Sequence, residues 1–366
     1  MKMEKETKNL CTSDLLKNVK SKYIVEQIFK LLKITRSLNI IKYNKFIQER
    51  CDINLDTYIK VFKKINQIEI KIIPKNNFGV NKNKNFINIE NTSDEKYCHI
   101  YFNNKKEEIK RNYYTEDDNV SSIKIILDYN INSLHKLFER CICIKKIYFN
   151  IFRKNITDMS YMFSDCSSIE EINFVNFNTD IVTDMSFMFS GCKSIEELDL
   201  SCFNTENVTD MKNMFNDCRS LKELNISSFD TQKVTDMRNM FNNCGYLKEL
   251  NISNFNTRNV ADMRNMFSNC TSLTHLDLSN FNTRNVMIMN KMFFCCTNLS
   301  SLDISNFSTY NVTHMNKMFW GCRCLREISD FYFNTENVID MNDICYKSSD
   351  EIQTKIRKSL SHFKCQ

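Results

Sequence analysis

Glycine and proline are scarce in this sequence of 366 residues, which has four glycines and a single proline, Pro74. Both residues are typical of loops and flexible linkers, so their scarcity leaves little room for linkers between domains. Hydrophobic residues make up 42% of the chain, an ordinary share for a folded protein. The composition therefore suits a folded chain with tight, uniform turns.

Long apolar runs are also missing. The amino terminus, MKMEKETKNLCTSDLLKNVKSKY, has no apolar core of the kind that a secretory signal needs. No other stretch approaches the length of a transmembrane helix. We therefore expect a cytoplasmic protein without a membrane span, in which the 17 cysteines stay reduced.

Motifs for catalysis and metal binding are absent as well. The sequence has no glycine-rich phosphate loop and no nucleophile motif, and its five histidines are isolated. Close cysteine pairs such as Cys141 and Cys143 lack the spacing of zinc ligands. The sequence therefore predicts a protein that is not an enzyme, with no catalytic residues, no cofactor and no metal.

Charge is divided unevenly along the chain. Residues 1–150 carry 29 Lys and Arg against 18 Asp and Glu, whereas residues 151–366 carry 21 against 26. The lysines of the basic part are scattered, without the interleaved aromatic residues typical of nucleic-acid binders. We expect a protein partner and no nucleic acid.

A repeat of 26 residues fills the second half of the chain without insertions. The methionine of each copy marks the period: Met159, Met185, Met211, Met237, Met263, Met289, Met315 and Met341. One copy cannot bury its apolar face alone, and a fixed period in this range is typical of stacked repeats. A cysteine at one column, as in Cys218 and Cys244, fits a tight buried corner as a free thiol.

Each copy contains two apolar patterns. In KELNIS, Leu224 and Ile226 alternate with polar residues, which predicts a short half-buried strand. In TDMKNMF, Met211, Met214 and Phe215 have helical spacing, which predicts a short helix. Thr209 would then cap that helix, and Asp210 would face the positive end of its dipole.

The pattern NVTDMxxMFxxCxxLxxLxLSxFxT over about residues 150–341 resembles the leucine-rich repeat of the bacterial-surface-protein-A (BspA) type. This resemblance implies an α/β solenoid, a right-handed leucine-rich-repeat stack with one short strand and one short helix per 26 residues. It also implies binding of other macromolecules without enzymatic activity.

The first part of the chain differs from the repeats. YIVEQIFKLLK…SLNIIKYNKFIQE resembles the core of an F-box, although it lacks the opening Leu-Pro and a late Trp. The resemblance implies docking of a Skp1-type linker protein through the apolar stripe Ile24, Ile28, Leu31 and Leu32. A helical cap or an oligomerisation element is the alternative.

Five segments follow from these patterns: a polar tail (1–18), a helical and F-box-like segment (19–64), a β-rich segment (65–130), the repeat stack with a degenerate first coil (131–346) and a closing helix (347–366). Two outward columns on the strands are the candidate partner-binding residues: Glu171, Glu197, Glu223, Glu249, Asn173, Asp199, Asn225, Asn251, Asp277 and Asp303. A charged face that only keeps the stack soluble is the alternative.

Aromatic residues break the consensus near the end of the repeats. Phe294 and Trp320 stand where other copies have Ser or Asn, so they suggest a contact surface or, for Trp320, packing against the closing helix. Taken together, the sequence predicts a non-enzymatic scaffold that binds a protein through its repeats. The alternatives are a substrate adapter of a ubiquitin ligase and a surface adhesion protein that interacts with a host.

Overall fold

The computed structural model describes residues 49, 67–75, 84–89, 94–128, 130–149, 155–175, 177–329 and 333–361. The chain divides into two units, Met1–Gln67 and Ile68–Gln366, and the architecture below is that of the second unit. The predicted tail and the F-box-like segment with Ile24, Ile28, Leu31 and Leu32 lie outside the described residues. The expected docking of a linker protein therefore stays a prediction.

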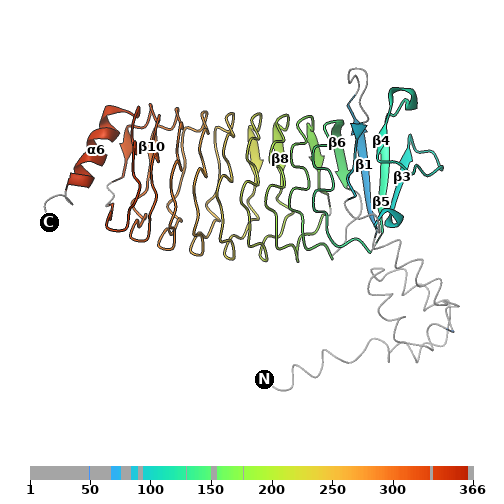
Figure 1. The fold of residues 1–366 in the computed structure, drawn as a ribbon, viewed down its shortest axis with the longest axis horizontal. Coiled ribbons are helices and arrows are strands. Elements are labelled where there is room, and N and C mark those ends of the chain that lie inside the picture. Colours follow the sequence, from blue (N-terminus) through green and yellow to red (C-terminus); the bar gives the residue numbers. More distant parts are fainter. Residues whose placement is uncertain are drawn as a thin grey trace, which may run out of the picture. The chain divides into compact units, whose positions relative to one another are not determined.

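A five-stranded sheet begins the second unit, in the order β3-β5-β1-β6-β7. All its pairs are antiparallel except β6–β7, which is parallel. The antiparallel sheet thus continues directly into the first repeats (Figure 1). The elements of this region are β1 (Ile68–Pro74), β2 (Lys84–Asn85), η1 (Glu95–Tyr97), β3 (Cys98–Phe102), β4 (Tyr113–Tyr114), η2 (Glu116–Asp118), β5 (Ile123–Leu127), β6 (Ile144–Phe149) and β7 (Glu171–Asn173).

The repeats form coils that lie side by side in a row (Figure 1). Parallel bridges join Asp158 to Asp184, Asp184 to Asp210, and so on to Asp340, one bridge for each 26-residue step. Parallel pairing also joins β8 (Glu197–Asp199) to β9 (Glu223–Asn225) and β10 (Ser301–Leu302) to β11 (Glu327–Ile328). The prediction of a repeat fold is confirmed.

After the last coil comes helix α6 (Asp350–Ser361). Ile352 and Ile356 on this helix are fully buried, and the Nζ atom of Lys355 donates a hydrogen bond of 2.5 Å to the carbonyl of Ile328 in β11. The helix therefore packs against the final coil. Among the described residues, no helix has the length and the apolar character that crossing a membrane requires.

The predicted helix in each repeat is wrong. The amides of Met211, Asn213 and Phe215 donate to carbonyls of the next coil at 2.9–3.3 Å. The amides between them bond within their own coil: Met214 donates to the carbonyl of Met211, three residues back, at 3.2 Å, and Lys212 donates to the side chain of Asp210 at 3.0 Å. In an α-helix the amides bond to the carbonyl four residues back. This segment is instead a series of turns, in which successive amides bond alternately to the next coil and to their own coil.

Left-handed backbone at two positions of each coil explains why the helix does not form. Asn213 and Asp217 have φ angles of 56° and 62°, a region that Asn, Asp and Gly tolerate best. The expected cap roles are also replaced. Thr209 donates its hydroxyl to the carbonyl of Thr183 in the preceding coil at 3.2 Å, and Asp210 accepts the amide of Lys212 at 3.0 Å. These are turn contacts rather than helix caps.

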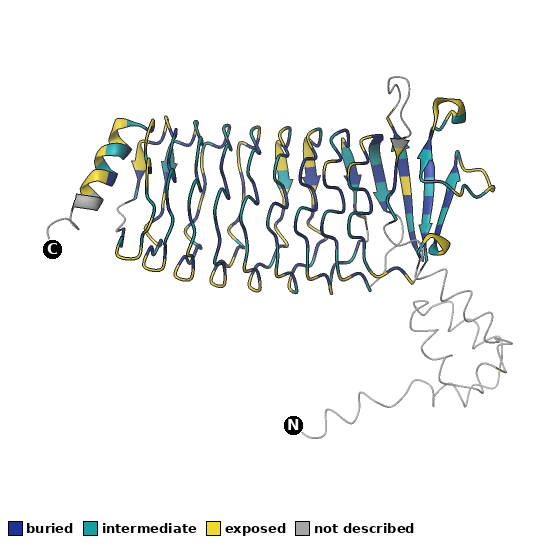
Figure 2. Ribbon diagram, in the orientation of Figure 1, coloured by how far each residue is buried: buried dark blue, intermediate teal, exposed yellow. Residues whose placement is uncertain are grey.

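Ladders of identical side chains fill the core. Figure 2 shows that buried residues recur along every coil. The phenylalanine rings from Phe138 to Phe319 stack with centroids 5.5–5.8 Å apart and planes within 9° of parallel. The cysteines of the repeat column are free, and the column is buried from Cys166 to Cys322. Dispersion between equal neighbours therefore recurs at every coil, which accounts for the constant period.

Candidate functional site

The first outward strand column is exposed over most of its length. Glu197, Glu223 and Glu249 are exposed and have no ion pair among the described residues. Glu171 differs, because its carboxylate lies 2.6 Å from the Nζ atom of Lys146. We call the outward surface of strands β7 to β11, with the equivalent residues of the coils between them, the strand face.

The side chains of the second column accept hydrogen bonds from the backbone at the end of their strands. The Oδ1 atom of Asp199 accepts the backbone amide of Ser201 at 3.0 Å, and Asp277 and Asp303 do the same with the amides two residues on. These amide bonds, followed by those from the serine hydroxyls, lower the pKa of all three carboxyls. The same turn occurs at Asn173, Asn225 and Asn251.

From Asn173 to Asp303, this second column therefore ends the strand of each coil with an Asx turn, whether its side chain is an amide or a carboxylate. The turn uses one oxygen of each aspartate and leaves the residue's charge at the surface, since Asp199, Asp277 and Asp303 are exposed. The aspartates of the column can contribute negative potential to a partner, whereas its asparagines can only offer hydrogen bonds.

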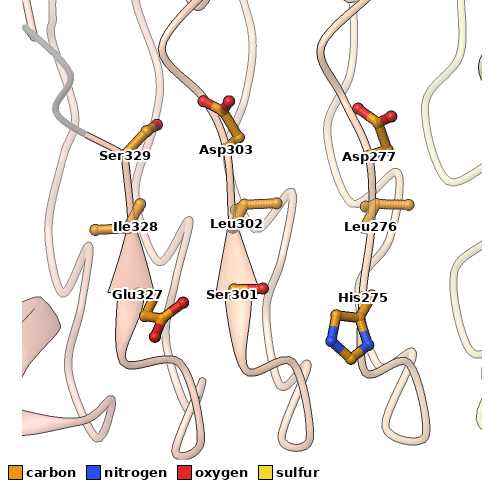
Figure 3. Close-up of a pocket in the computed structure, with 9 residues that line it drawn as sticks. All are labelled: His275, Leu276, Asp277, Ser301, Leu302, Asp303, Glu327, Ile328 and Ser329. Carbon is orange, nitrogen blue, oxygen red and sulfur yellow. The ribbon is translucent and has the colours of Figure 1, made fainter.

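A hollow of about 540 Å³ lies on the strand face over the last three coils (Figure 3). Its floor is the buried trio Leu276, Leu302 and Ile328. Asp277 and Asp303 stand along one side of the hollow, and His275, Ser301 and Glu327 along the other. The hollow forms where the glutamate column is interrupted by the smaller Ser301 and by His275.

Negative charge dominates the surroundings of the hollow. Asp277, Asp303 and Glu327 have no ion pair among the described residues. One column away, charges are neutralised within the stack, as where Lys222 meets Glu196 at 2.6 Å. Within the described part of the chain, no group of three His, Cys, Asp or Glu side chains is arranged to hold a metal ion. The site therefore offers carboxylates and a small apolar floor to a cationic group.

Sequence reasoning identified Asp277 and Asp303 but missed the other residues around the hollow, Glu327 and Ser329 included. The signal was present in the sequence, because two consecutive copies lack the glutamate of the consensus at positions 275 and 301. Such a break looks like ordinary surface variation until the coils are stacked and positions 275 and 301 become neighbours.

A family model described as "Mycoplasma protein of unknown function, DUF285" matches residues 132–250 and 237–359, more than half of the chain. A leucine-rich repeat protein from Bacteroides ovatus is 19% identical, with a TM-score of 0.28, over 61% of this chain and 70% of that one. A complex of TLR13 with ssRNA13 is 12% identical, with a TM-score of 0.18, over 53% of this chain and 41% of that one. Comparison with curated proteins gave no match.

Proposed function

We propose, on the premise that this chain belongs to the DUF285 family, that it is a non-enzymatic scaffold of the leucine-rich-repeat type that holds a protein partner on its strand face. The observation that carries the proposal is the hollow lined by Asp277, Asp303 and Glu327, whose carboxylates form no ion pair among the described residues.

The chemistry of the hollow favours a basic segment of the partner. A lysine or arginine side chain can lay its aliphatic stem on Leu302 while its charged group meets Asp303 or Glu327. Exposed carboxylates at Glu197, Glu223 and Glu249 extend the negative potential along the stack and speed the encounter with a basic partner.

Rigidity of the strand face supports the same role. Each strand from β7 to β10 is held by neighbouring coils and ends in an Asx turn, as at Asp303 with Ser305 at 2.9 Å. Binding to such a surface costs little conformational entropy on the protein's own side, so more of the contact energy appears as affinity.

The test compares two charge-neutralised proteins with the natural one. The site variant carries Asp303→Asn and Glu327→Gln, and the Asx turn survives because asparagine makes it elsewhere in the column. The control variant carries Glu206→Gln and Glu336→Gln, two exposed carboxylates that do not line the hollow. Each tagged full-length protein is purified from its own cells, and co-purified proteins are identified by mass spectrometry.

We expect a partner that is recovered with the natural protein and with the control, but is lost or strongly reduced with the site variant. Equal recovery of the same proteins by all three would show that binding does not use the strand face near the hollow. Recovery of none by the natural protein would contradict a scaffold role.

A further inference from the structure

Three aromatic side chains stand in one outward column of the last three coils. Phe294, Trp320 and Tyr346 occupy positions that are small and polar in the preceding coils, namely Ser164, Ser190, Asn216, Asn242 and Ser268. The rings of Phe294 and Trp320 stack with centroids 4.7 Å apart and planes 13° from parallel, and Tyr346 follows at 6.4 Å from Trp320. The substitution is therefore concerted, because three successive coils change together.

This column remains at the surface. The aromatic rings next to Trp320 are those of Phe294 and Tyr346. The predicted packing of Trp320 against the closing helix stays a prediction. Phe294 and Trp320 are half-buried, and the side chain of Tyr346 is 56% exposed. Helix α6 buries other residues, Ile352 and Ile356. The aromatic side chains thus form a partly exposed apolar edge.

Positive charge surrounds the aromatic column. The Nζ atom of Lys347 lies 5.2 Å from the ring centroid of Trp320 and 5.6 Å from that of Tyr346, and Lys291 lies 5.9 Å from Phe294. Arg323 also lies near this edge, because its charge acts on the thiol of Cys295 together with that of Lys347. Burial raises the pKa of Cys295, and the two cations lower it by a smaller amount. None of these three cations has a carboxylate partner in the described part of the chain.

The same region carries less negative charge. The bridge column holds aspartate in five successive coils, from Asp158 to Asp262, changes to Ile288 and His314, and returns to aspartate at Asp340. The ladder of carboxylates is therefore interrupted in the coils of Phe294 and Trp320. We call Phe294, Trp320, Tyr346, Lys291, Arg323 and Lys347 the aromatic–basic edge.

We infer that the aromatic–basic edge is a second binding surface, separate from the strand face, and that it takes an acidic protein segment carrying apolar side chains. Tyr, Trp and Arg are the residues that most often dominate protein interfaces, and unpaired cations select a partner of opposite charge. Here they lie together within three coils.

Two features favour an acidic protein over single-stranded nucleic acid. Bases need free ring faces on which to stack, whereas Phe294 and Trp320 already stack on each other and present their edges. A phosphate chain that extended beyond the edge would also meet Asp262 and the carboxylates before it. A short acidic segment confined to the coils of Phe294 and Trp320 avoids both problems, because the bridge column there holds Ile288 and His314.

The repeat itself supplies variants that fit the fold. A charge variant carries Lys291→Asn, Arg323→Thr and Lys347→Asn, each the residue found at the same column in earlier coils. Positions 291 and 347 have left-handed φ angles of 56° and 58°, which asparagine tolerates well. A ring variant carries Phe294→Ser, Trp320→Asn and Tyr346→Ser on the same principle.

A matched control lies on the same outer side of the turns at the other end of the stack. Tyr161 and Phe187 also stack, with centroids 4.4 Å apart, and the Nζ atom of Lys136 lies 5.9 Å from the centroid of the Tyr161 ring. The control variant carries Tyr161→Asn and Phe187→Asn, which removes two stacked rings without touching the aromatic–basic edge.

The probe is a fluorescein-labelled 15-residue peptide of glutamate and leucine, titrated with each full-length protein by fluorescence anisotropy. We expect the natural protein and the control to bind it, and the charge and ring variants to bind about tenfold more weakly. Thermal unfolding checks that all variants keep the fold. Equal affinity of all four proteins, no binding by the natural protein, or tighter binding of a 15-nucleotide oligothymidine would each overturn the proposal.

Discussion

The thiol of Cys244 donates a hydrogen bond to the backbone carbonyl of Phe215 at 3.2 Å, and so ties each coil to the one before it. The same bond recurs from Cys166 to Phe138 and at every copy up to Cys322, which bonds to Phe293. Cysteine fits this column because it fills a small apolar space and also supplies a weak donor to a buried carbonyl.

Replacing Cys244 with alanine removes the donor and leaves a small void against a packed ladder. We expect Cys244→Ala to lower the free energy of unfolding by about 1–2 kcal/mol. Urea unfolding followed by circular dichroism measures the change. A stability equal to that of the natural protein would show that the thiol contact contributes nothing.

Reactivity of the thiols follows from burial. Burial raises the pKa of Cys270 to about 12, and its side chain is almost fully enclosed, so its thiol stays protonated and inaccessible near neutral pH. Cys324 is exposed. We expect iodoacetamide to modify Cys324 in the folded protein while Cys270 reacts only after denaturation, as followed by peptide mass mapping. Comparable rates for the two cysteines would contradict this arrangement.

The left-handed turns and the helix that the sequence suggested predict opposite effects of Asn239→Ala on stability. In a helix, Asn239→Ala would stabilise the protein, because alanine is the best helix former. Asn239 instead has a φ angle of 54°, so we expect Asn239→Ala to destabilise the protein by about 1 kcal/mol. Asn239→Gly, which relieves the same constraint, should be close to neutral, and thermal unfolding of both variants distinguishes the two structures.

Acid sensitivity has a source in the first sheet region. The guanidinium of Arg111, followed by contacts from Thr115, lowers the pKa of Asp118 to about 2. A carboxyl whose pKa is lower in the folded than in the unfolded protein stabilises the fold above its unfolded pKa, and this contribution disappears as pH falls through the folded value. We expect Asp118→Asn to lower the Tm by a few degrees at pH 7 and to leave it unchanged near pH 2. A Tm difference independent of pH would rule out the ion pair as its cause.

The sequence was sufficient to predict the period, the inward columns and the short strands, because the spacing of apolar residues reports burial directly. It failed at TDMKNMF because Met211, Met214 and Phe215 point inward in a helix and in this chain of turns alike. The distinguishing residues were Asn213 and Asp217, whose tolerance of left-handed backbone was given no weight.

The candidate surfaces were predicted less completely. The outward columns were found from alternation, but the hollow depends on two consecutive departures from glutamate, His275 and Ser301, becoming neighbours across coils. The stacking of Phe294 on Trp320 depends likewise on equivalent positions meeting along the stack. Contacts between residues 26 apart become visible only once the repeat is aligned in space.

The two ends of the stack are closed differently, and this fixes which part of the molecule can change length. Strand β1 pairs with β6 on its outer side, and α6 covers the final coil, so both ends are built from unique segments. Every coil between them offers the same bonding pattern to its neighbours. Gain or loss of a whole 26-residue copy would therefore leave both ends intact and move the hollow relative to the first sheet by one strand spacing, about 4.8 Å. The number of copies in this protein therefore sets the distance between the hollow and the first sheet.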